Sequence, residues 1–443
     1  MTKDSLAVAI EALSWMAYAN LGERNALFKA AEQLGISRAS ELRQAHRLIM
    51  EITRFQNRLE YLISQAMTQD EIKRAPHGIS SFLKMLAYLK YVDGASQKDL
   101  ARTVSWARQV MGWREIHPYE EQIALIVSGS IPLRPDALPE FEKLSFETCH
   151  PSWFVERMVR LFGRNRALRM LRRNLQSVPA YARLNSLKVT DEAEKVRIAK
   201  GLGGSKIEGV KDVLRLGKPG RALLQSDLFA SGVIVVQDLA SITAGLVTSP
   251  KPGQTVFDIC AAPGNKTTHL AEQMQNKGVI YSIDISDRRL AYWRKEVERT
   301  GCSIATPIRA DGRRIPLKYE ADVVLVDPPC SNTGVFARNP AIKWKITSAR
   351  VNEFSLKQYA ILQAASELVG SNGALVYCTC SILPEENEYV LEAFLRRNPN
   401  FKVVPQTPFL GSSGLRGFDQ CQRFYPHLHD CNGYFIAKLQ RTD

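Results

Sequence analysis

Apolar residues in the second half of the chain fall in short uninterrupted runs that alternate with amphipathic stretches. Strands buried on both faces of a parallel sheet produce such runs, because neither face meets water. The stretches between them carry apolar residues at helical spacing. This alternation predicts a doubly wound, parallel α/β sheet with right-handed crossovers. The expected strands are 255–260, 279–285, 305–308, 322–326, 374–379 and 434–439, and the expected helices are 266–275, 287–299, 351–369 and 386–397.

The first part of the chain has a different pattern, with apolar residues at helical spacing and turn signals between the stretches. One apolar stripe contains Leu6, Ile10, Leu13 and Met16, and a second covers 48–63. Several helices with short connections predict a small all-α bundle. Helix and strand signals mix between this bundle and the sheet, which predicts a small α+β module. The expected domains are therefore 1–145, 146–231 and 232–443.

The composition is that of a globular protein, with 443 residues, 45% hydrophobic and 23% charged. No apolar run is long enough to span a bilayer, and the start MTKDSLAVAI lacks the segments of a signal peptide. The eight cysteines form no CxxC pair, a pattern typical of reduced thiols rather than a disulfide framework. We therefore expect a cytoplasmic protein without membrane association, and a monomer.

Basic residues outnumber acidic ones by 59 to 45, which gives a formal net charge of +14. Such an excess indicates a polyanionic partner, most often a nucleic acid. Eight arginines fall between Arg157 and Arg183 with no acidic residue among them. A solvated helix surface would explain this run, but guanidinium groups suit phosphate oxygens, so we expect phosphate contacts. A second candidate basic face lies in the bundle and contains Arg43, His46, Arg47, Arg54 and Arg58.

A loop that is suited to a cofactor follows the first strand of the sheet. Asp258 ends the strand, Gly264 permits close approach of a ligand to the backbone, and a helix begins near Lys266. The loop matches neither GxGxxG nor a Walker A motif, so it favours a nucleoside cofactor with a small charged tail over a pyrophosphate. A purely structural turn is the alternative. The candidate cofactor-binding residues here are Cys260, Ala261, Ala262, Pro263, Gly264, Asn265 and Lys266.

Two further acids lie where the next two strands end. Asp284 lies about twenty residues beyond the loop glycine, where a carboxylate can accept both hydroxyls of a ribose. Asp311 lies where it can accept a hydrogen bond from an amino group of a base. Each has a structural alternative, a helix N-cap for Asp284 and a turn before glycine for Asp311. Because acids follow three successive strands, we expect them to form one side of a pocket.

Two cysteine motifs follow two other expected strands. The run VVLVDPPC places Asp327 and Cys330 after a buried strand, and the two prolines between them force a stiff turn. The run YCTCS places Cys378 and Cys380 on one face of a strand, unless the second swings into the loop. A structural zinc site would need four ligands, usually in CxxC pairs, so we expect no metal. Thiols and a carboxylate at strand ends indicate chemistry at a bound ligand.

These motifs resemble those of the RsmB/Sun/Nop family of RNA 5-methylcytosine methyltransferases. The resemblance implies a Rossmann-like methyltransferase domain with S-adenosylmethionine as its cofactor and RNA as its partner. The helical part is similar to a NusB-like RNA-binding domain, and the middle part to an RRM-like module. Asn265 departs from the glycine that many members carry, but it leaves the helix N-terminus intact. The matching stretches are FDICAAPGNKTTHLAE, IDIS, RADGRRIP, VDPPCSNTG, YCTCSILPEENE and NGYFIAKL.

The resemblance also implies a role for each catalytic residue. Cytosine carbon 5 is a poor nucleophile, and addition of a thiolate to carbon 6 enables it to attack a methyl group. By resemblance, Cys380 is the attacking nucleophile and Cys330 assists its release. Asp327 is expected to bind the cytosine ring edge, and Lys266 to give electrostatic support. The expected cofactor contacts are completed by Asp284, Arg289, Asp311 and Asp327.

Several alternatives stay open at this point. Transfer to another base or to DNA is possible, although transfer to an amino group needs no thiol. An RNA-binding assembly factor with a silent site is the alternative outside the enzyme class, but every catalytic position is present. The NusB-like part favours ribosomal RNA over transfer RNA as the substrate, by analogy of fold.

Overall fold

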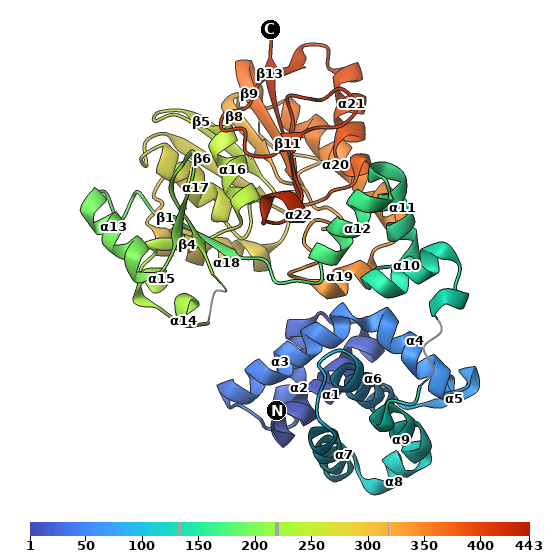
Figure 1. The fold of residues 1–443 in the computed structure, drawn as a ribbon. Helices are drawn as coiled ribbons and strands as arrows, with labels where there is room; N and C mark the ends of the chain where they lie inside the picture. The colour runs from blue at the N-terminus through green and yellow to red at the C-terminus, as the bar shows by residue number, and fades with distance from the viewer. Residues whose placement is uncertain (132–134, 218–220, 318) are drawn as a thin grey trace. The chain divides into compact units, whose positions relative to one another are not determined.

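The computed structural model describes residues 1–131, 135–217, 221–317 and 319–443. The chain forms two compact units (Figure 1). The first contains Met1–Leu175 and Asn339–Lys345, and the second contains Gln176–Arg338 and Ile346–Asp443. These units do not coincide with the three expected domains, whose division therefore stays a prediction.

Helices build the first unit, as the apolar periodicity predicts. The helix α6 (His77–Tyr91) is buried on several sides and packs against α1, α4, α7 and α9. Phe82, Met85 and Leu86 of α6 are fully buried, which accounts for its central place in the apolar core. The other helices are α1 (Lys3–Ala19), α2 (Glu23–Gln33), α3 (Ala39–Arg54), α4 (Gln56–Ala66), α5 (Gln69–Arg74), α7 (Gln97–Met111), α8 (Trp113–Ile116), α9 (Glu120–Ser128), α10 (Glu140–Thr148), α11 (Ser152–Phe162) and α12 (Arg164–Arg173).

A short helix from the catalytic half of the sequence also belongs to this unit. This helix, α19 (Pro340–Lys345), packs against α3. The buried Nζ of Lys343 donates hydrogen bonds to the carbonyls of Arg54 at 2.7 Å and Cys149 at 2.5 Å. Nε1 of Trp344 donates to the carbonyl of Thr53 at 2.7 Å. The expected span 232–443 therefore includes a segment that packs with the N-terminal helices, which its sequence pattern does not reveal.

Two arginines of the candidate basic face in the bundle serve the fold instead. Arg54 is buried, and its Nη1 donates to the carbonyl of Asn174 at 3.0 Å. Arg58 donates to the carbonyls of Phe146 and Glu147, the latter at 2.8 Å. Both guanidinium groups therefore bind carbonyls at or near helix C-terminal ends, where a cation is favourable. The expectation that they belong to an RNA-binding face is wrong for Arg54, whose side chain has almost no exposed surface.

The second unit contains a small antiparallel sheet in the order β2-β3-β1-β4. Both of its faces are covered, since one packs against α13 and the other joins the core of the large sheet. β1 is buried at every position. The fourth strand lies beyond residue 231, the expected end of the module. The elements are β1 (Ala180–Leu184), α13 (Glu192–Gly201), β2 (Ser205–Ile207), β3 (Val210–Leu216), α14 (Arg221–Leu224), α15 (Asp227–Ala230) and β4 (Ile234–Val236).

The large sheet has the strand order β11-β12-β13-β9-β8-β5-β6-β7, and β10 pairs with β13. The strands from β9 to β7 along this path are parallel, which confirms the predicted sheet, whereas β13 is antiparallel to β9. The strands are β5 (Thr255–Ile259), β6 (Val279–Asp284), β7 (Ala305–Arg309), β8 (Ala321–Val326), β9 (Val369–Thr379), β10 (Phe401–Val403), β11 (Ser412–Ser413), β12 (Gln422–Phe424) and β13 (Tyr434–Arg441).

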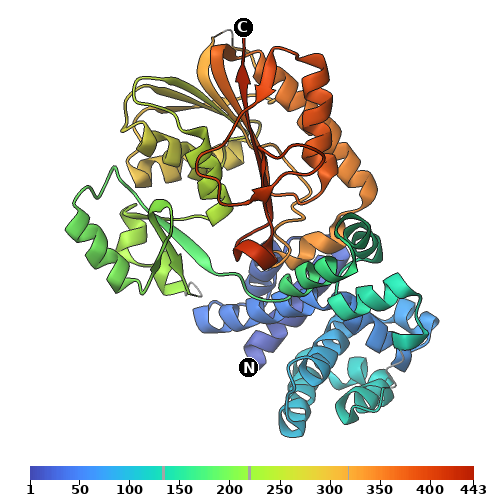
Figure 2. The same cartoon turned by 45° about the horizontal axis from the view of Figure 1, so that its top comes forward.

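Helices cover both faces of this sheet (Figure 2). Alternate strand residues face opposite sides, so Val323 and Leu325 pack with α16 and α17, while Val324 and Val326 pack with α20 and α21. This two-sided burial explains the uninterrupted apolar runs. The remaining helices are α16 (Leu239–Thr248), α17 (Asn265–Gln273), α18 (Asp287–Thr300), α20 (Ser348–Ser366), α21 (Glu388–Arg397) and α22 (Pro426–His429).

Candidate active site

The candidate residues lie at one edge of the large sheet, where its parallel strands end. The strand order reverses between β5 and β8, which is the position where sheets of this kind bind ligands. The loops after β5, β8 and β9 contact one another there. Lys266, in the first turn of α17 directly after the first loop, binds Asp327 of the second loop. The sulfur of Cys330 in the second loop contacts that of Cys380 in the third.

The loop after β5 turns sharply into α17. Gly264 has a φ of +110°, which other residues rarely adopt, and a Cβ there would lie 3.1 Å from Cδ1 of Trp293. Cys260 also has a positive φ, of +65°. Burial raises the pKa of its thiol to about 12, so Cys260 is a neutral part of the loop at physiological pH. The loop can therefore present backbone groups to a ligand at close range.

Asp284 lies beside this loop and is almost completely buried. Its Oδ2 accepts a hydrogen bond from the N–H of Ala262 at 3.3 Å, and its Oδ1 accepts one from the N–H of Ser286 at 3.1 Å. Arg289 forms an ion pair with Asp284, with 3.3 Å between Nη1 and Oδ2, and donates to the carbonyl of Ala262. The structure thus brings Asp284, Arg289 and the loop together.

Asp311 has a different partner. Its carboxylate accepts hydrogen bonds from Arg313 at 2.6 and 3.1 Å. These bonds lower the pKa of Asp311 to about 2, so its carboxylate is ionised at physiological pH. Among the described residues, its carboxylate bonds to Arg313 and to none of the candidate site residues.

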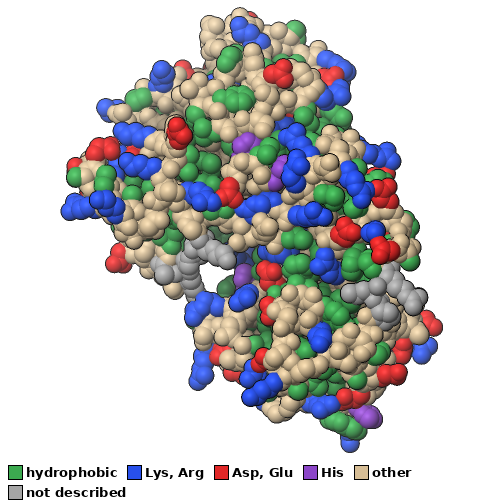
Figure 3. Space-filling view, in the orientation of Figure 1, with side chains coloured by type: hydrophobic (Ala, Val, Ile, Leu, Met, Phe, Trp, Pro, Cys, Tyr) green, Lys and Arg blue, Asp and Glu red, His purple; other side chains and the backbone are tan. Residues whose placement is uncertain are grey.

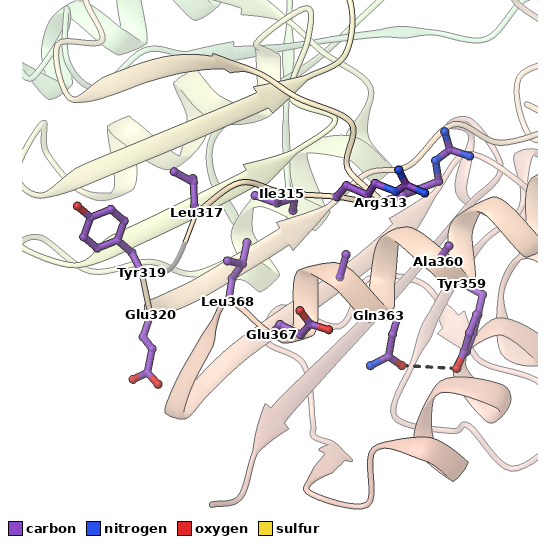
Figure 4. Close-up of a pocket in the computed structure, with 12 residues that line it drawn as sticks. Arg313, Ile315, Leu317, Tyr319, Glu320, Tyr359, Ala360, Gln363, Glu367 and Leu368 are labelled. Atoms are coloured by element: carbon purple, nitrogen blue, oxygen red, sulfur yellow. Dashed lines mark hydrogen bonds between the residues drawn. The ribbon is translucent and has the colours of Figure 1, made fainter.

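A cavity of about 690 Å³ lies next to Asp311, between the segment that follows it and α20 (Figure 4). Arg313, Ile315 and Leu317 line one side, and Tyr359, Gln363 and Leu368 line the other. None of the candidate catalytic or cofactor residues is part of its lining. Size alone therefore does not identify the active site in this structure.

The two cysteines selected from the sequence are in direct contact. Their sulfurs are 3.0 Å apart, and the Sγ of Cys380 donates to Oδ1 of Asn332 at 2.9 Å. Cys330 is buried, whereas Cys380 is half-buried. The hydrogen bond with Cys380, burial and the charge of Glu386 raise the pKa of Cys330 well above its ordinary value. Cys330 is therefore a protonated thiol at physiological pH.

Asp327 is held from two sides at the start of its loop. Its Oδ2 accepts a hydrogen bond from Nζ of Lys266 at 2.6 Å. Its Oδ1 accepts one from the hydroxyl of Tyr434 at 3.3 Å and a weaker one from the thiol of Cys378 at 3.7 Å. Burial alone would lower the pKa of Lys266, but the charge of Asp327 and the hydrogen bond to it raise this pKa, so Lys266 stays charged. The orientation of Asp327 is thus defined by Lys266 and Tyr434.

Sequence reasoning missed Asn332 and Tyr434 as members of this site. Asn332 lies two residues beyond Cys330, and its φ of +58° turns it out of the ordinary backbone regions. Tyr434 begins the last strand and lies in the matching stretch NGYFIAKL. Position within a matching motif was the only signal for either residue.

The arginine run expected to contact phosphates divides between the two units. Arg183 is buried in the second unit and forms an ion pair with Glu272, so its expected place on a basic surface is wrong. In the first unit Arg160 pairs with Glu156 and Arg164 with Glu140. Arg169 and Arg172 are exposed on α12. Figure 3 shows basic side chains scattered over the visible face with acidic ones between them.

The described ranges contain no group of three or more His, Cys, Asp or Glu side chains that could hold a metal ion. No helix in these ranges combines the length and apolarity that a membrane span requires.

Comparison with known proteins identifies the family of this chain. Residues 245–440 match the model of a family described as 16S rRNA methyltransferase RsmB/F. The probable ribosomal RNA small subunit methyltransferase B of Bacillus subtilis is 30% identical over 72% of this chain and 74% of its own length. The tRNA (cytosine(72)-C(5))-methyltransferase of Pyrococcus horikoshii is 36% identical over 50% of this chain and 56% of its own length.

Solved structures show the same fold. The crystal structure of PH0851 matches with a TM-score of 0.82 and 29% identity, covering 100% of this chain and 99% of its own. The structure of NSun6 from Pyrococcus horikoshii with SFG matches with a TM-score of 0.61 and 25% identity, over 66% and 98% of the two chains. The sheet and its strand-end site define an α/β methyltransferase. More narrowly, the chain belongs to the RsmB/F family of RNA methyltransferases.

Proposed function

We propose that this protein transfers a methyl group from S-adenosylmethionine to carbon 5 of a cytosine in RNA, through a covalent adduct with Cys380. The observation that carries this proposal is the contact between the sulfurs of Cys330 and Cys380, at the sheet edge that also holds Asp327. Thiol addition to carbon 6 is the means by which a protein can activate carbon 5.

The residues beside the loop after β5 fit S-adenosylmethionine. A carboxylate has about four acceptor positions. Asp284 uses two of them for backbone N–H groups, and Nη1 of Arg289 lies 3.3 Å from its Oδ2. It therefore retains capacity for a hydroxyl of a ribose. The N-terminus of α17 lies next to the loop and favours a carboxylate group. When bound, S-adenosylmethionine supplies the methyl group. We propose that S-adenosylmethionine is held by Cys260, Ala261, Ala262, Pro263, Gly264, Asn265, Lys266, Asp284, Arg289, Asp311 and Asp327.

The two cysteines have distinct proposed roles. The Sγ of Cys380 bonds to carbon 6 of the cytosine, and carbon 5 then takes the methyl group. A base such as water takes the proton from carbon 5, the electron pair of that bond restores the double bond between carbons 5 and 6, and Sγ of Cys380 leaves as a thiolate. Cys330 assists this last step, since its thiol lies 3.0 Å from the leaving sulfur and can donate its proton to it. Cys380 is the more exposed of the two, and Cys330 is a buried, protonated thiol. These differences support Cys380 as the nucleophile.

Asp327 is proposed to bind the ring edge of the cytosine. The adduct with Cys380 is protonated at its ring nitrogen, and the N–H formed there can donate a hydrogen bond to the Asp327 carboxylate, which stabilises the adduct. Lys266 and Tyr434 hold the two oxygens of Asp327 in place, so the carboxyl group is oriented before the base arrives. Preorganisation of this kind avoids a reorganisation cost during reaction.

Ribosomal RNA of the small subunit is the proposed substrate. The small-subunit ribosomal RNA methyltransferase B of Bacillus subtilis matches 72% of this chain, whereas the archaeal tRNA methyltransferase matches 50%. Transfer RNA is the second candidate, because the match to the archaeal tRNA (cytosine(72)-C(5))-methyltransferase is higher in identity, although shorter. We also propose that the N-terminal helices are NusB-like, that the small sheet is RRM-like, and that the protein is a cytoplasmic monomer.

Isotope transfer tests the activity. The protein is incubated with labelled S-adenosylmethionine and either small-subunit ribosomal RNA or total transfer RNA, and 5-methylcytosine is located in each. We expect label in ribosomal RNA from the wild type and from Cys302→Ala, which removes a buried thiol outside the site. Label in neither RNA refutes the enzyme assignment, and label in transfer RNA alone replaces the proposed substrate.

A further inference from the structure

Each cysteine of the active site is followed by a serine, and both serines bind the same buried carboxylate. Ser331 follows Cys330 in the loop after β8, and Ser381 follows Cys380 after β9. The hydroxyls of both serines donate to Oε2 of Glu386, that of Ser381 at 2.5 Å. Glu386 therefore connects the two loops, which lie 50 residues apart in the sequence.

The other oxygen of Glu386 has two donors of its own. Oε1 accepts hydrogen bonds from the N–H of Ser331 at 2.7 Å and from Nε2 of Gln358 at 2.9 Å. Nε2 of Gln358 also donates to the carbonyl of Pro329 at 3.0 Å, one residue before Cys330. The backbone on both sides of Cys330 is thus attached to Glu386, directly or through Gln358.

The partners of Glu386 fit a hydrogen-bond acceptor. The N–H of Ser331 and the Nε2 of Gln358 can only donate, so Oε1 accepts from both. The N–H groups of Ile382 and Leu383 donate to the hydroxyls of Thr333 and Ser381, both at 3.1 Å. Each of these hydroxyls keeps its own hydrogen, and that of Ser381 is directed at Oε2 of Glu386. A carboxylate can accept from all of these partners.

Glu386 has no exposed surface, and an ionised carboxylate in that position is costly unless it is fully hydrogen-bonded. Burial raises the pKa of Glu386, while the bonds from Ser331, Ser381 and Gln358 oppose the shift. The same charge contributes to the raised pKa of Cys330. If this position served packing alone, a hydrophobic residue would fill it without the desolvation cost of a buried carboxylate.

We propose that Glu386 is a positioning residue that sets the separation of Cys330 and Cys380, acting on each through the serine that follows it. Its effect on methylation rests on the function proposed above, whereas its effect on the distance between the sulfurs does not. Two thiols form a disulfide readily only when their sulfurs and Cβ atoms can reach a narrow geometry. The rate of disulfide formation therefore reports the separation without any RNA.

The test compares the wild type with Glu386→Gln and with a control, Glu392→Gln, on the exposed side of α21. The amide of Glu386→Gln places N–H groups where the wild-type carboxylate accepts hydrogen bonds from the two serine hydroxyls. Each protein is treated with diamide, and formation of the Cys330–Cys380 disulfide is followed by peptide mass spectrometry. Ser381→Ala removes one of the two serine hydroxyls that bind Glu386, together with the bond that this hydroxyl accepts from the N–H of Leu383, and it leaves the glutamate in place. It is the second variant if Glu386→Gln does not fold.

We expect disulfide formation to slow by about tenfold in Glu386→Gln and less in Ser381→Ala, with Glu392→Gln unchanged. We also expect kcat to fall by about 100-fold, because a misplacement of about 1 Å has that effect, with the Kd for S-adenosylmethionine unchanged. Disulfide rates within twofold of the wild type in both variants would overturn the proposal. If disulfide formation is slower in the variants but the wild type methylates no RNA, the proposed function is refuted. The role of Glu386 in setting the separation of the two thiols then still stands.

Discussion

The hydroxyl of Tyr434 offers a direct way to test how Asp327 is oriented. Tyr434→Phe removes this hydroxyl, which lies 3.3 Å from Oδ1 of Asp327 and 3.4 Å from Sγ of Cys378, while the buried ring keeps its packing. Oδ1 of Asp327 then keeps only the weak bond from Cys378 at 3.7 Å, while Lys266 still holds Oδ2. The carboxylate is thus held at one oxygen and can rotate about that contact.

The expected loss follows from the hydrogen bond that is removed. A bond to a charged acceptor contributes roughly 1.5–3 kcal/mol. The bond from Tyr434 is long, at 3.3 Å, so its value lies near the lower limit. A loss of about 1.5 kcal/mol in the transition state lowers kcat roughly tenfold. Because Tyr434 acts through Asp327, which is proposed to bind the cytosine, its loss should change kcat rather than the binding of S-adenosylmethionine.

Steady-state kinetics with RNA and calorimetry with S-adenosylmethionine distinguish these contributions. We expect a lower kcat in Tyr434→Phe and a nearly unchanged Kd for S-adenosylmethionine. The matched control is Tyr181→Phe, which removes a buried hydroxyl that donates to the carbonyl of Asp430 at 3.2 Å, away from the site. If kcat of Tyr434→Phe stays within twofold of the control, Tyr434 does not orient Asp327 and this reasoning is wrong.

Three further predictions concern the cofactor, the RNA and the first unit. Asp284→Asn should weaken S-adenosylmethionine binding by about 2 kcal/mol in calorimetry, and Asp311→Asn by less, because Arg313 already occupies the Asp311 carboxylate; equal losses would contradict the assignment. RNA affinity should fall steeply with salt, and Arg169→Ala with Arg172→Ala should reduce the slope of log Kd against log salt; an unchanged slope excludes this surface. Burial lowers the pKa of Lys343 to about 7 in the folded protein. Between pH 7 and about 10.4 the unfolded chain therefore binds the additional proton, so the stability contributed at this site rises with pH. In urea titrations, the free energy of unfolding of the wild type should therefore rise relative to that of Lys343→Met as the pH increases over that range. A constant difference between the two proteins would refute the lowered pKa of Lys343.

The strands and the thiol pair could be predicted from the sequence because their signals are local. A strand that is buried on both faces, such as β8, appears in the sequence as an uninterrupted apolar run. Asp327 and Cys330 follow this run within four residues. Parallel strands bring their carboxyl ends to one edge, so the loop after β9 was expected nearby. The contact between Cys330 and Cys380 follows from that topology.

Other features depend on contacts that the sequence does not encode locally. The hydroxyl of Tyr434 meets Asp327 across 107 positions of sequence, and Arg183 meets Glu272 across 89. Arg183 reads as part of a basic surface by composition, yet its partner allows it to be buried. The helix α19 looks like part of a loop in the catalytic half, and only its hydrogen bonds to residues such as Thr53 assign it to the first unit.

Trapping the covalent adduct tests the central claim most directly. Cys330→Ala, Cys380→Ala and the wild type are each incubated with substrate RNA and S-adenosylmethionine, and the denatured mixtures are separated by electrophoresis. The account predicts a protein–RNA adduct that accumulates in Cys330→Ala, because release is impaired, and none in Cys380→Ala, which also loses turnover. An adduct in Cys380→Ala but not in Cys330→Ala would contradict the assigned roles of the two thiols.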